Sequence, residues 1–174
     1  MLRIDCDESG VPQIQPHVRV HWRHLERDDP GLDATRVLYA MQHRKSRRLL
    51  YLGKADFQTV AQRLKCRSKL GVWARIEEEV GYVASCTALL GEFEVAPGVR
   101  LTQQMLSDAE SLLIMGEDPP GNRQCRKGRI TRPGLCVACL GQWPGRARAY
   151  LDNDFDDEFF GNSRVNVWSS RWNR

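Results

Sequence analysis

Residues 37–54 read VLYAMQHRKSRRLLYLGK, and this stretch decides the fold that the sequence predicts. It contains two short apolar runs, at 37–41 and 49–52, and Gly53 follows the second run. The segment between the runs is rich in arginine and lysine. Two runs of β-favouring residues on either side of a polar turn are typical of a β-hairpin. We therefore expect two antiparallel strands here.

Each strand of the expected hairpin carries one tyrosine, Tyr39 in the first and Tyr51 in the second. If the loop has an odd number of residues centred near Lys45, the two tyrosines are directly opposed and point to the same face of the sheet. Both phenols then lie side by side, with Lys54 just beyond them. A loop with an even number of residues separates them. The alternative interpretation is that both tyrosines simply pack in the core of the sheet.

The hairpin and the segments after it resemble a known family. The triplets Val37-Leu38-Tyr39 and Tyr51-Leu52-Gly53, with eleven residues between them, resemble the paired motif that names the GIY-YIG nuclease superfamily. The first triplet departs from that motif at two letters and the second at one. Three further features follow in the family's order: Arg63 on one expected helix, Glu110 on a later one, and the turn Pro119-Pro120-Gly121-Asn122. The resemblance covers roughly residues 36–123.

The resemblance implies an α+β fold with a small three-stranded antiparallel sheet flanked by helices. The third strand is expected at 88–95, and Asp56 is the expected N-cap of the helix that carries Arg63. We expect residues 1–35 to form an N-terminal arm, which contributes a possible extra strand at the sheet edge. Residues 36–123 form the nuclease-like core, and residues 124–174 form a C-terminal extension packed on it.

The resemblance also implies a site that hydrolyses phosphodiester bonds. Such a site needs a positioned water, a group that accepts its proton and a cation to offset the developing charge. Glu110 is expected to bind one Mg²⁺ or Mn²⁺, and Arg63 the scissile phosphate. Tyr39, with a depressed pKa, is expected to act as general base or to orient the water, and Tyr51 assists it. Further nucleic-acid contacts are expected from Lys54, Arg67, Asn122, Arg44 and Lys45.

The charge distribution favours a nucleic acid as the partner. The formal net charge is only +4, but ten lysines and arginines and a single acid lie between Arg36 and Lys69. Seven more basic residues and no acid lie between Asn122 and Arg148. Segregated positive charge is typical of proteins that bind polyanions, although charge runs also occur on plain solvated surfaces. Because the basic segments coincide with the motif residues, we expect DNA as the partner.

Length and composition exclude other classes of protein. At 174 residues the chain has the length of a single domain, and its 41% hydrophobic and 28% charged content is ordinary for a soluble protein. No apolar run approaches the ~18 residues that a membrane span needs. The N-terminal residues lack the apolar segment of a signal peptide. We therefore expect a cytoplasmic protein with no membrane contact.

Two alternatives to a nuclease stay open. One is a non-catalytic nucleic-acid-binding protein with the same fold. The other is a zinc-stabilised interaction protein, because Cys136 and Cys139 have the spacing of a zinc-binding thiolate pair. A structural Zn²⁺ needs four ligands, so Cys125 is the candidate third ligand, and Cys66 or a histidine the fourth. Otherwise these cysteines are buried or surface thiols in a reducing compartment.

Overall fold

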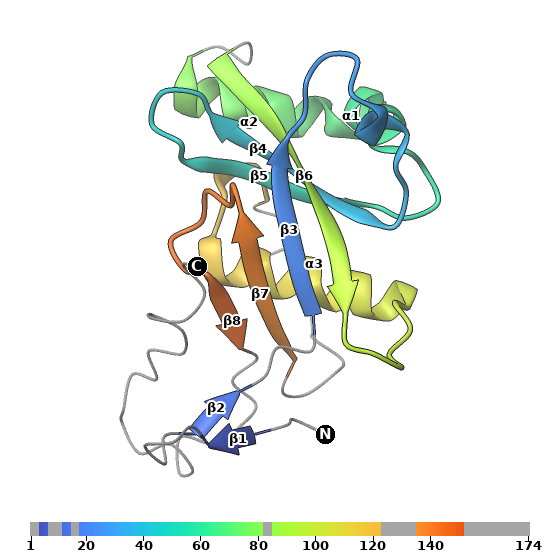
Figure 1. Cartoon of the computed structure of the whole chain (residues 1–174). Coiled ribbons are helices and arrows are strands. Elements are labelled where there is room, and N and C mark those ends of the chain that lie inside the picture. Colours follow the sequence, from blue (N-terminus) through green and yellow to red (C-terminus); the bar gives the residue numbers. More distant parts are fainter. Residues whose placement is uncertain (1–3, 7–11, 15–17, 82–84, 123–134, 152–174) are drawn as a thin grey trace.

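The structure is a computed structural model that describes residues 4–6, 12–14, 18–81, 85–122 and 135–151 (Figure 1). The described residues form one six-stranded sheet, with the strand order β5-β4-β6-β3-β7-β8, and a separate two-stranded sheet. The six strands are β3 (Val18–His24), β4 (Val37–His43), β5 (Leu49–Ala55), β6 (Cys86–Val95), β7 (Cys136–Gly141) and β8 (Ala149–Leu151). The two-stranded sheet pairs β1 (Ile4–Cys6) with β2 (Pro12–Ile14).

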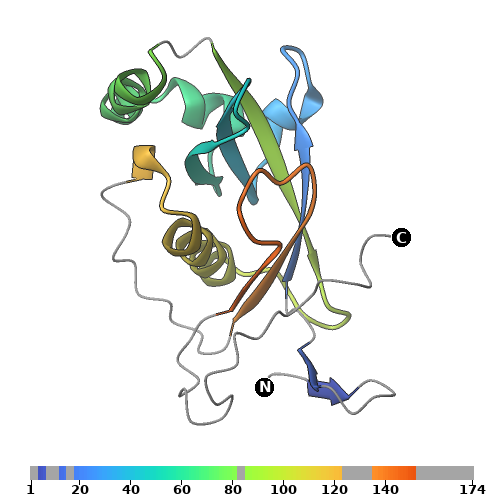
Figure 2. The ribbon, with the colours of Figure 1, turned by 90° about the vertical axis from the view of Figure 1, so that its left-hand side faces the viewer.

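The prediction of a small three-stranded antiparallel sheet is wrong. The three strands expected from the sequence are present as β4, β5 and β6, but β3, β7 and β8 belong to the same sheet. The sheet is mixed because β3 runs parallel to β7 and antiparallel to β6. It is also strongly curled, so that it resembles half a barrel (Figures 1 and 2). β3 therefore lies inside the sheet, not at the edge where an extra strand was expected.

The β4–β5 hairpin is buried on both faces, which explains its continuous apolar runs. Because successive strand residues point to opposite faces, Leu38 and Leu52 belong to one hydrophobic cluster and Tyr39 and Tyr51 to another. The first cluster, here called the α3 core, packs β3, β4 and β7 against helix α3 (Gln103–Glu117). The second, the α2 core, packs the other face of the hairpin against helix α2 (Leu70–Val80) and its neighbours.

The remaining helices are short. Helix α1 (Val60–Lys65) begins at Thr59, whose side chain forms a capping box with Gln62, so Asp56 is not the N-cap. The 3₁₀ turn η2 (Arg67–Lys69) then leads into α2, and η1 (Pro30–Asp33) precedes β4. The 3₁₀ turn η4 (Pro120–Asn122) follows α3 and lies between α2 and α3 in Figure 2. No helix among the described residues is long and apolar enough to cross a membrane.

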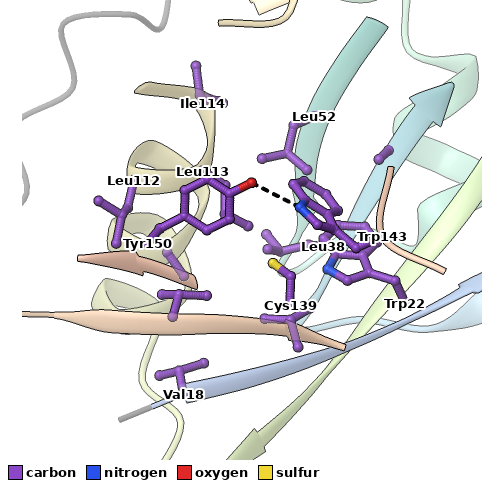
Figure 3. Packing of buried hydrophobic residues seen from close by; sticks show 14 of the residues in the cluster. Val18, Trp22, Leu38, Leu52, Leu112, Leu113, Ile114, Cys139, Trp143 and Tyr150 are labelled. Carbon is purple, nitrogen blue, oxygen red and sulfur yellow. Dashed lines mark hydrogen bonds between the residues drawn. The ribbon is translucent and has the colours of Figure 1, made fainter. Parts of the chain in front are cut away.

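Aromatic side chains fill the end of the α3 core that is formed by β7 and β8 (Figure 3). The ring centroids of Trp22 and Trp143 are 4.6 Å apart, and those of Trp143 and Tyr150 are 6.2 Å apart in an edge-on arrangement. The Trp143 Nε1 group donates a hydrogen bond of 3.0 Å to the Tyr150 hydroxyl, which in turn donates to the Glu117 carboxylate. The Trp143 Nε1 group and the Tyr150 hydroxyl are therefore both hydrogen-bonded inside the core, as buried polar groups generally are.

Candidate active site at the edge strand β5

Gly53 provides the space in which the two tyrosines meet. Tyr39 pairs with Gly53, and Met41 pairs with Tyr51, so the two tyrosines are diagonal neighbours on one face. The condition for direct opposition is not met: residue 53, and not residue 51, lies opposite residue 39, and a register shift between Met41 and Gln42 contributes to this alignment. A Cβ atom on Gly53 would lie 2.7 Å from the Tyr51 hydroxyl and 2.8 Å from that of Tyr39. Only glycine leaves room for both phenols.

The two phenols are buried beside a lysine that the sequence analysis did not select. Tyr39 is 1% exposed and Tyr51 is 4% exposed, and their ring centroids lie 5.9 Å apart. Lys69, in η2, is itself buried, and its Nζ donates to the Tyr51 hydroxyl. The same Nζ lies 4.5 Å from the centre of the Tyr51 ring. The sequence signal for Lys69 was weak, because a lysine among several basic residues reads as a surface charge.

Glu110 reaches the same region from helix α3. Its Oε2 atom lies 3.7 Å from the Nζ of Lys54, and both side chains are mostly covered. The Lys54 Nζ also contacts the hydroxyl of Ser107, one turn before Glu110 on α3. The backbone N–H of Lys54 lies close enough to lower the pKa of the Glu110 carboxyl. Because β5 is an edge strand, its outer side is open to these contacts from the helix.

Arg63 on helix α1 completes the cluster and carries unused hydrogen-bonding capacity. Its Nε atom is buried and has no hydrogen-bond partner in the described part of the chain. The Tyr39 hydroxyl is also buried and also lacks a hydrogen-bond partner among the described residues. It lies close enough to Arg63 and Tyr51 for both to lower its pKa, but neither contact reaches hydrogen-bond geometry. Other buried side-chain atoms in the described part of the chain also lack a partner, Trp22 Nε1 in the α3 core among them. These two atoms differ because both lie in the cluster that contains Glu110, where one ligand could pair with both.

Burial dominates the acid–base properties of the site. It raises the pKa of Glu110, and the cations Lys54, Lys69 and Arg63 counteract that rise. It also raises the pKa of Tyr39, although the neighbouring Tyr51 and Arg63 oppose the effect. The pKa of Tyr51 is raised by burial first and by Tyr39 second. The sequence predicted a depressed pKa for Tyr39, whereas its burial in the protein raises that pKa.

The other residues expected to bind nucleic acid occupy different positions. Asn122 is buried, and its side-chain amide pairs with the backbone of Leu52, accepting at 2.8 Å and donating at 2.7 Å. It thus covers part of the exposed edge of β5 and positions that strand. Arg67 is exposed in η2, next to the cluster in sequence. Arg44 and Lys45 are exposed in the β4–β5 turn, at the opposite end of the hairpin from Lys54.

The geometry of β7 does not suit a zinc-binding thiolate pair. Cys136 and Cys139 are three positions apart on this strand, so their side chains point to opposite faces of the sheet. Cys139 is fully buried in the α3 core, where burial raises the pKa of its thiol, and burial raises that of Cys136 as well. Cys125, the candidate third ligand, lies outside the described residues. We therefore treat Cys136 and Cys139 as core thiols.

The described side chains of the site supply too few ligands for a divalent cation, so a substrate would have to supply others. Among the residues that the structure describes, no three side chains of His, Cys, Asp and Glu gather closely enough to form a ligand set of their own. Glu110 offers one carboxylate, and Mg²⁺ typically binds through one or two carboxylates together with waters and substrate phosphates. The donor set therefore fits Mg²⁺ or Mn²⁺ if phosphate oxygens and water complete the coordination.

The structure thus brings Tyr39, Tyr51, Arg63 and Glu110 together at one edge of the sheet, although they are far apart in the sequence. It adds Lys54 and Lys69 to them. The functional roles assigned to these residues remain predictions. Comparisons with protein-family models, with curated proteins and with solved structures find no match to this chain.

Proposed function

We propose that this chain is a metal-dependent endonuclease that hydrolyses DNA phosphodiester bonds at the outer edge of β5. The observation that supports the proposal is the grouping of one carboxylate, Glu110, with the cations Lys54, Lys69 and Arg63 beside two phenols. Three cations against one carboxylate leave the cluster positively charged, which suits a bound phosphate. The resemblance of 37–54 to the GIY-YIG motif is independent support from the sequence.

Each side chain has a role that follows from its position. The Arg63 guanidinium, with a buried nitrogen free of partners in the described part of the chain, donates to the scissile phosphate and offsets its charge. Because burial raises the pKa of Tyr39, this residue serves as a neutral phenol that orients the attacking water. Lys69 fixes the Tyr51 hydroxyl and keeps positive charge next to it.

The cation would be held by Glu110 together with phosphate oxygens of the substrate. When bound, it polarises a phosphoryl oxygen and stabilises the charge that develops there. Lys54 lies beside the carboxylate and helps to keep Glu110 ionised, since it lowers a pKa that burial raises. Lys54 thus offsets part of the effect of burial, and a bound cation would further favour the charged carboxylate.

Cleavage of a supercoiled plasmid tests the proposal. The full chain is incubated with Mg²⁺ or Mn²⁺, and EDTA serves as the metal-free control. We expect the wild type to nick or linearise the plasmid and Glu110→Gln to lose roughly 100-fold or more in rate, as when a group that stabilises the transition state is removed. Glu79→Gln is the matched control, because Glu79 is a partly covered helix glutamate that pairs with Arg48 at 3.0 Å, away from the site. It should cleave like the wild type.

Two outcomes would overturn the proposal. The first is equal cleavage by Glu110→Gln and the wild type. The second is no cleavage by folded wild-type protein of plasmid, single-stranded or branched DNA with either metal. If that protein still binds DNA, the non-catalytic nucleic-acid-binding alternative replaces the nuclease.

A further inference from the structure

We propose that a hollow next to the cleavage centre binds an unpaired nucleobase that carries an exocyclic amino group. The hollow has a volume of about 490 Å³ and is lined by Thr35, Arg36, Asp56, Phe57 and Gln103. It lies where the start of β4, the end of β5 and the start of α3 come together. The binding of a base in this hollow is independent of the proposed function. Only the assignment of that base to the nucleotide beside the scissile phosphate rests on the proposed function.

Phe57 provides the surface on which a base can stack. Its side chain is 84% exposed, more than any other large apolar residue in the described part of the chain. A single exposed apolar side chain is common and needs no explanation by itself. Phe57 differs because it borders a hollow that also contains hydrogen-bonding groups. Aromatic side chains next to a basic surface are the usual platforms for unpaired bases, since every base has a face that can stack.

Asp56 gives the hollow a preference among bases. Its carboxylate lines the hollow and accepts no hydrogen bond from the residues that the structure describes. A carboxylate is an acceptor only, and it pairs with the amino group of a base such as cytosine. Thymine has no amino group to offer. A base that donates to the carboxylate supplies a hydrogen bond that the described residues do not supply, so an amino-bearing base is favoured.

Arg36 holds two walls of the hollow together. Its backbone adopts a left-handed conformation with φ of 58°, which is uncommon for a residue other than glycine. Its guanidinium donates to the backbone oxygen of Leu101, just before α3. This contact ties the start of β4 to the start of α3 and places a positive charge at the rim of the hollow. A charge at that position suits the phosphate attached to a bound base.

The hollow is connected to the cleavage centre along one face of α3. Gln103, Ser107 and Glu110 are spaced so that all three lie on the same side of the helix. Seven residues separate Gln103 from Glu110, or about 10 Å along the helix axis. Ser107 lies between them and contacts both the Gln103 backbone oxygen and Lys54. A nucleotide adjacent to a phosphate held near Glu110 can therefore reach the hollow.

Binding of labelled single-stranded oligonucleotides in EDTA tests the inference without cleavage. Fluorescence anisotropy measures the affinity of the full chain for a run of deoxycytidines and for a run of thymidines of equal length. We expect Phe57→Ala to weaken binding of the deoxycytidine strand by roughly 5- to 100-fold, and Phe57→Trp to keep it. Leu70→Ala is the matched control, because Leu70 is 66% exposed and outside the hollow, and it should bind like the wild type. Asp56→Ala should remove the preference for deoxycytidine.

The outcomes separate this inference from the proposed function. Wild-type affinity in folded Phe57→Ala, or an equal loss in Leu70→Ala, overturns the base-binding hollow. Equal affinity of the wild type for both strands overturns the preference for amino-bearing bases. If no substrate is cleaved but binding depends on Phe57, only the nuclease proposal falls. If cleavage depends on Glu110 but binding does not depend on Phe57, only the hollow falls.

Discussion

Tyr150 and Tyr39 are both buried phenols that lie against a glycine, yet their surroundings differ. The Tyr150 hydroxyl accepts from Trp143 Nε1 at 3.0 Å (Figure 3), and it donates to Glu117. The Tyr39 hydroxyl has no hydrogen-bond partner among the described residues, although it lies beside Tyr51 and cations. The first arrangement is complete without a ligand and the second is not. The two phenols therefore differ in the satisfaction of the polar atom and not in burial, and the functional role of Tyr39 remains a prediction.

The two carboxylates next to these phenols show the same contrast. Glu117 is 4% exposed and accepts from the Tyr150 hydroxyl, from the backbone N–H of Arg146 at 2.8 Å and from that of Ala147 at 3.4 Å. These contacts fix the β7–β8 connection against the end of α3. The Glu110 carboxylate instead lies 3.7 Å from the Nζ of Lys54, and 20% of its side chain is exposed. We expect this more open carboxylate to be the one that binds a cation.

The largest effect is expected from Gly53→Ala, because both phenols of the candidate site must move. The added methyl would lie 2.7 Å from the Tyr51 hydroxyl and 2.8 Å from the Tyr39 ring carbon Cζ. We expect cleavage to fall by about 100-fold or more, since small misplacements of catalytic groups cost that much, and unfolding free energy to fall by about 1–3 kcal/mol. Plasmid cleavage and chemical denaturation measure the two quantities.

Gly116→Ala is the matched control for that variant. A Cβ there would lie 2.6 Å from Cδ1 of Tyr150, so this substitution also disturbs a phenol. We expect a similar loss of stability and unchanged cleavage, because Tyr150 lies in the α3 core. Equal loss of cleavage in both variants would show that the distinction between the two phenol clusters is wrong.

Tyr39→Phe is expected to reduce cleavage while leaving stability unchanged. The hydroxyl has no partner among the described residues, so its removal breaks no hydrogen bond seen in the structure. It does remove the group that we assign to the attacking water, which costs about 100-fold in rate. Cleavage rates and urea denaturation of the variant test this. A loss of more than about 1 kcal/mol in unfolding free energy would mean that the hydroxyl is structural after all.

Tyr150→Phe is expected to give the opposite pattern. Its hydroxyl is paired with both Trp143 and Glu117. Its removal leaves the nearly buried Glu117 carboxylate without that donor, while Trp143 Nε1 keeps the Ala147 backbone oxygen as an acceptor at 3.0 Å. The unfolding free energy should fall by about 1–3 kcal/mol, and cleavage at a temperature where the protein stays folded should not change. Thermal and urea denaturation measure the first effect. Unchanged stability would contradict a structural role for this network.

Sequence patterns predicted the elements of the fold that form between residues close together in the chain. The apolar runs on either side of a basic turn gave the β4–β5 hairpin, and the apolar stripe around Glu110 lies within α3. The pairing of β3 with β7 was missed because Val18 and Val137 are 119 residues apart and no local turn joins them. The pairing of Tyr39 differs by two residues from direct opposition to Tyr51, and a register shift between Met41 and Gln42 contributes to this difference. Lys69 was missed because only tertiary packing buries it.

The smallest effect concerns the pH dependence of stability at Glu110. Burial raises the pKa of this carboxyl in the folded protein, in spite of Lys54, Lys69 and Arg63. A raised folded-state pKa means that the folded protein binds the proton more tightly than the unfolded chain does. The wild type therefore loses stability as the pH rises from the ordinary carboxyl value through the raised one, with a slope of at most about 1.4 kcal/mol per pH unit. Glu110→Gln, which does not titrate, should lack this loss.

We therefore expect Glu110→Gln to gain stability relative to the wild type as the pH rises through that window, and the difference to stay constant above it. Urea denaturation of both proteins between about pH 4 and pH 8 measures the difference. An opposite slope would mean that the three cations outweigh burial and depress the pKa of Glu110. That result would mean that the fold stabilises the charge of Glu110. A carboxylate strained by burial, by contrast, gains from a cation that binds it, and this gain links the stability measurement to the proposed metal site.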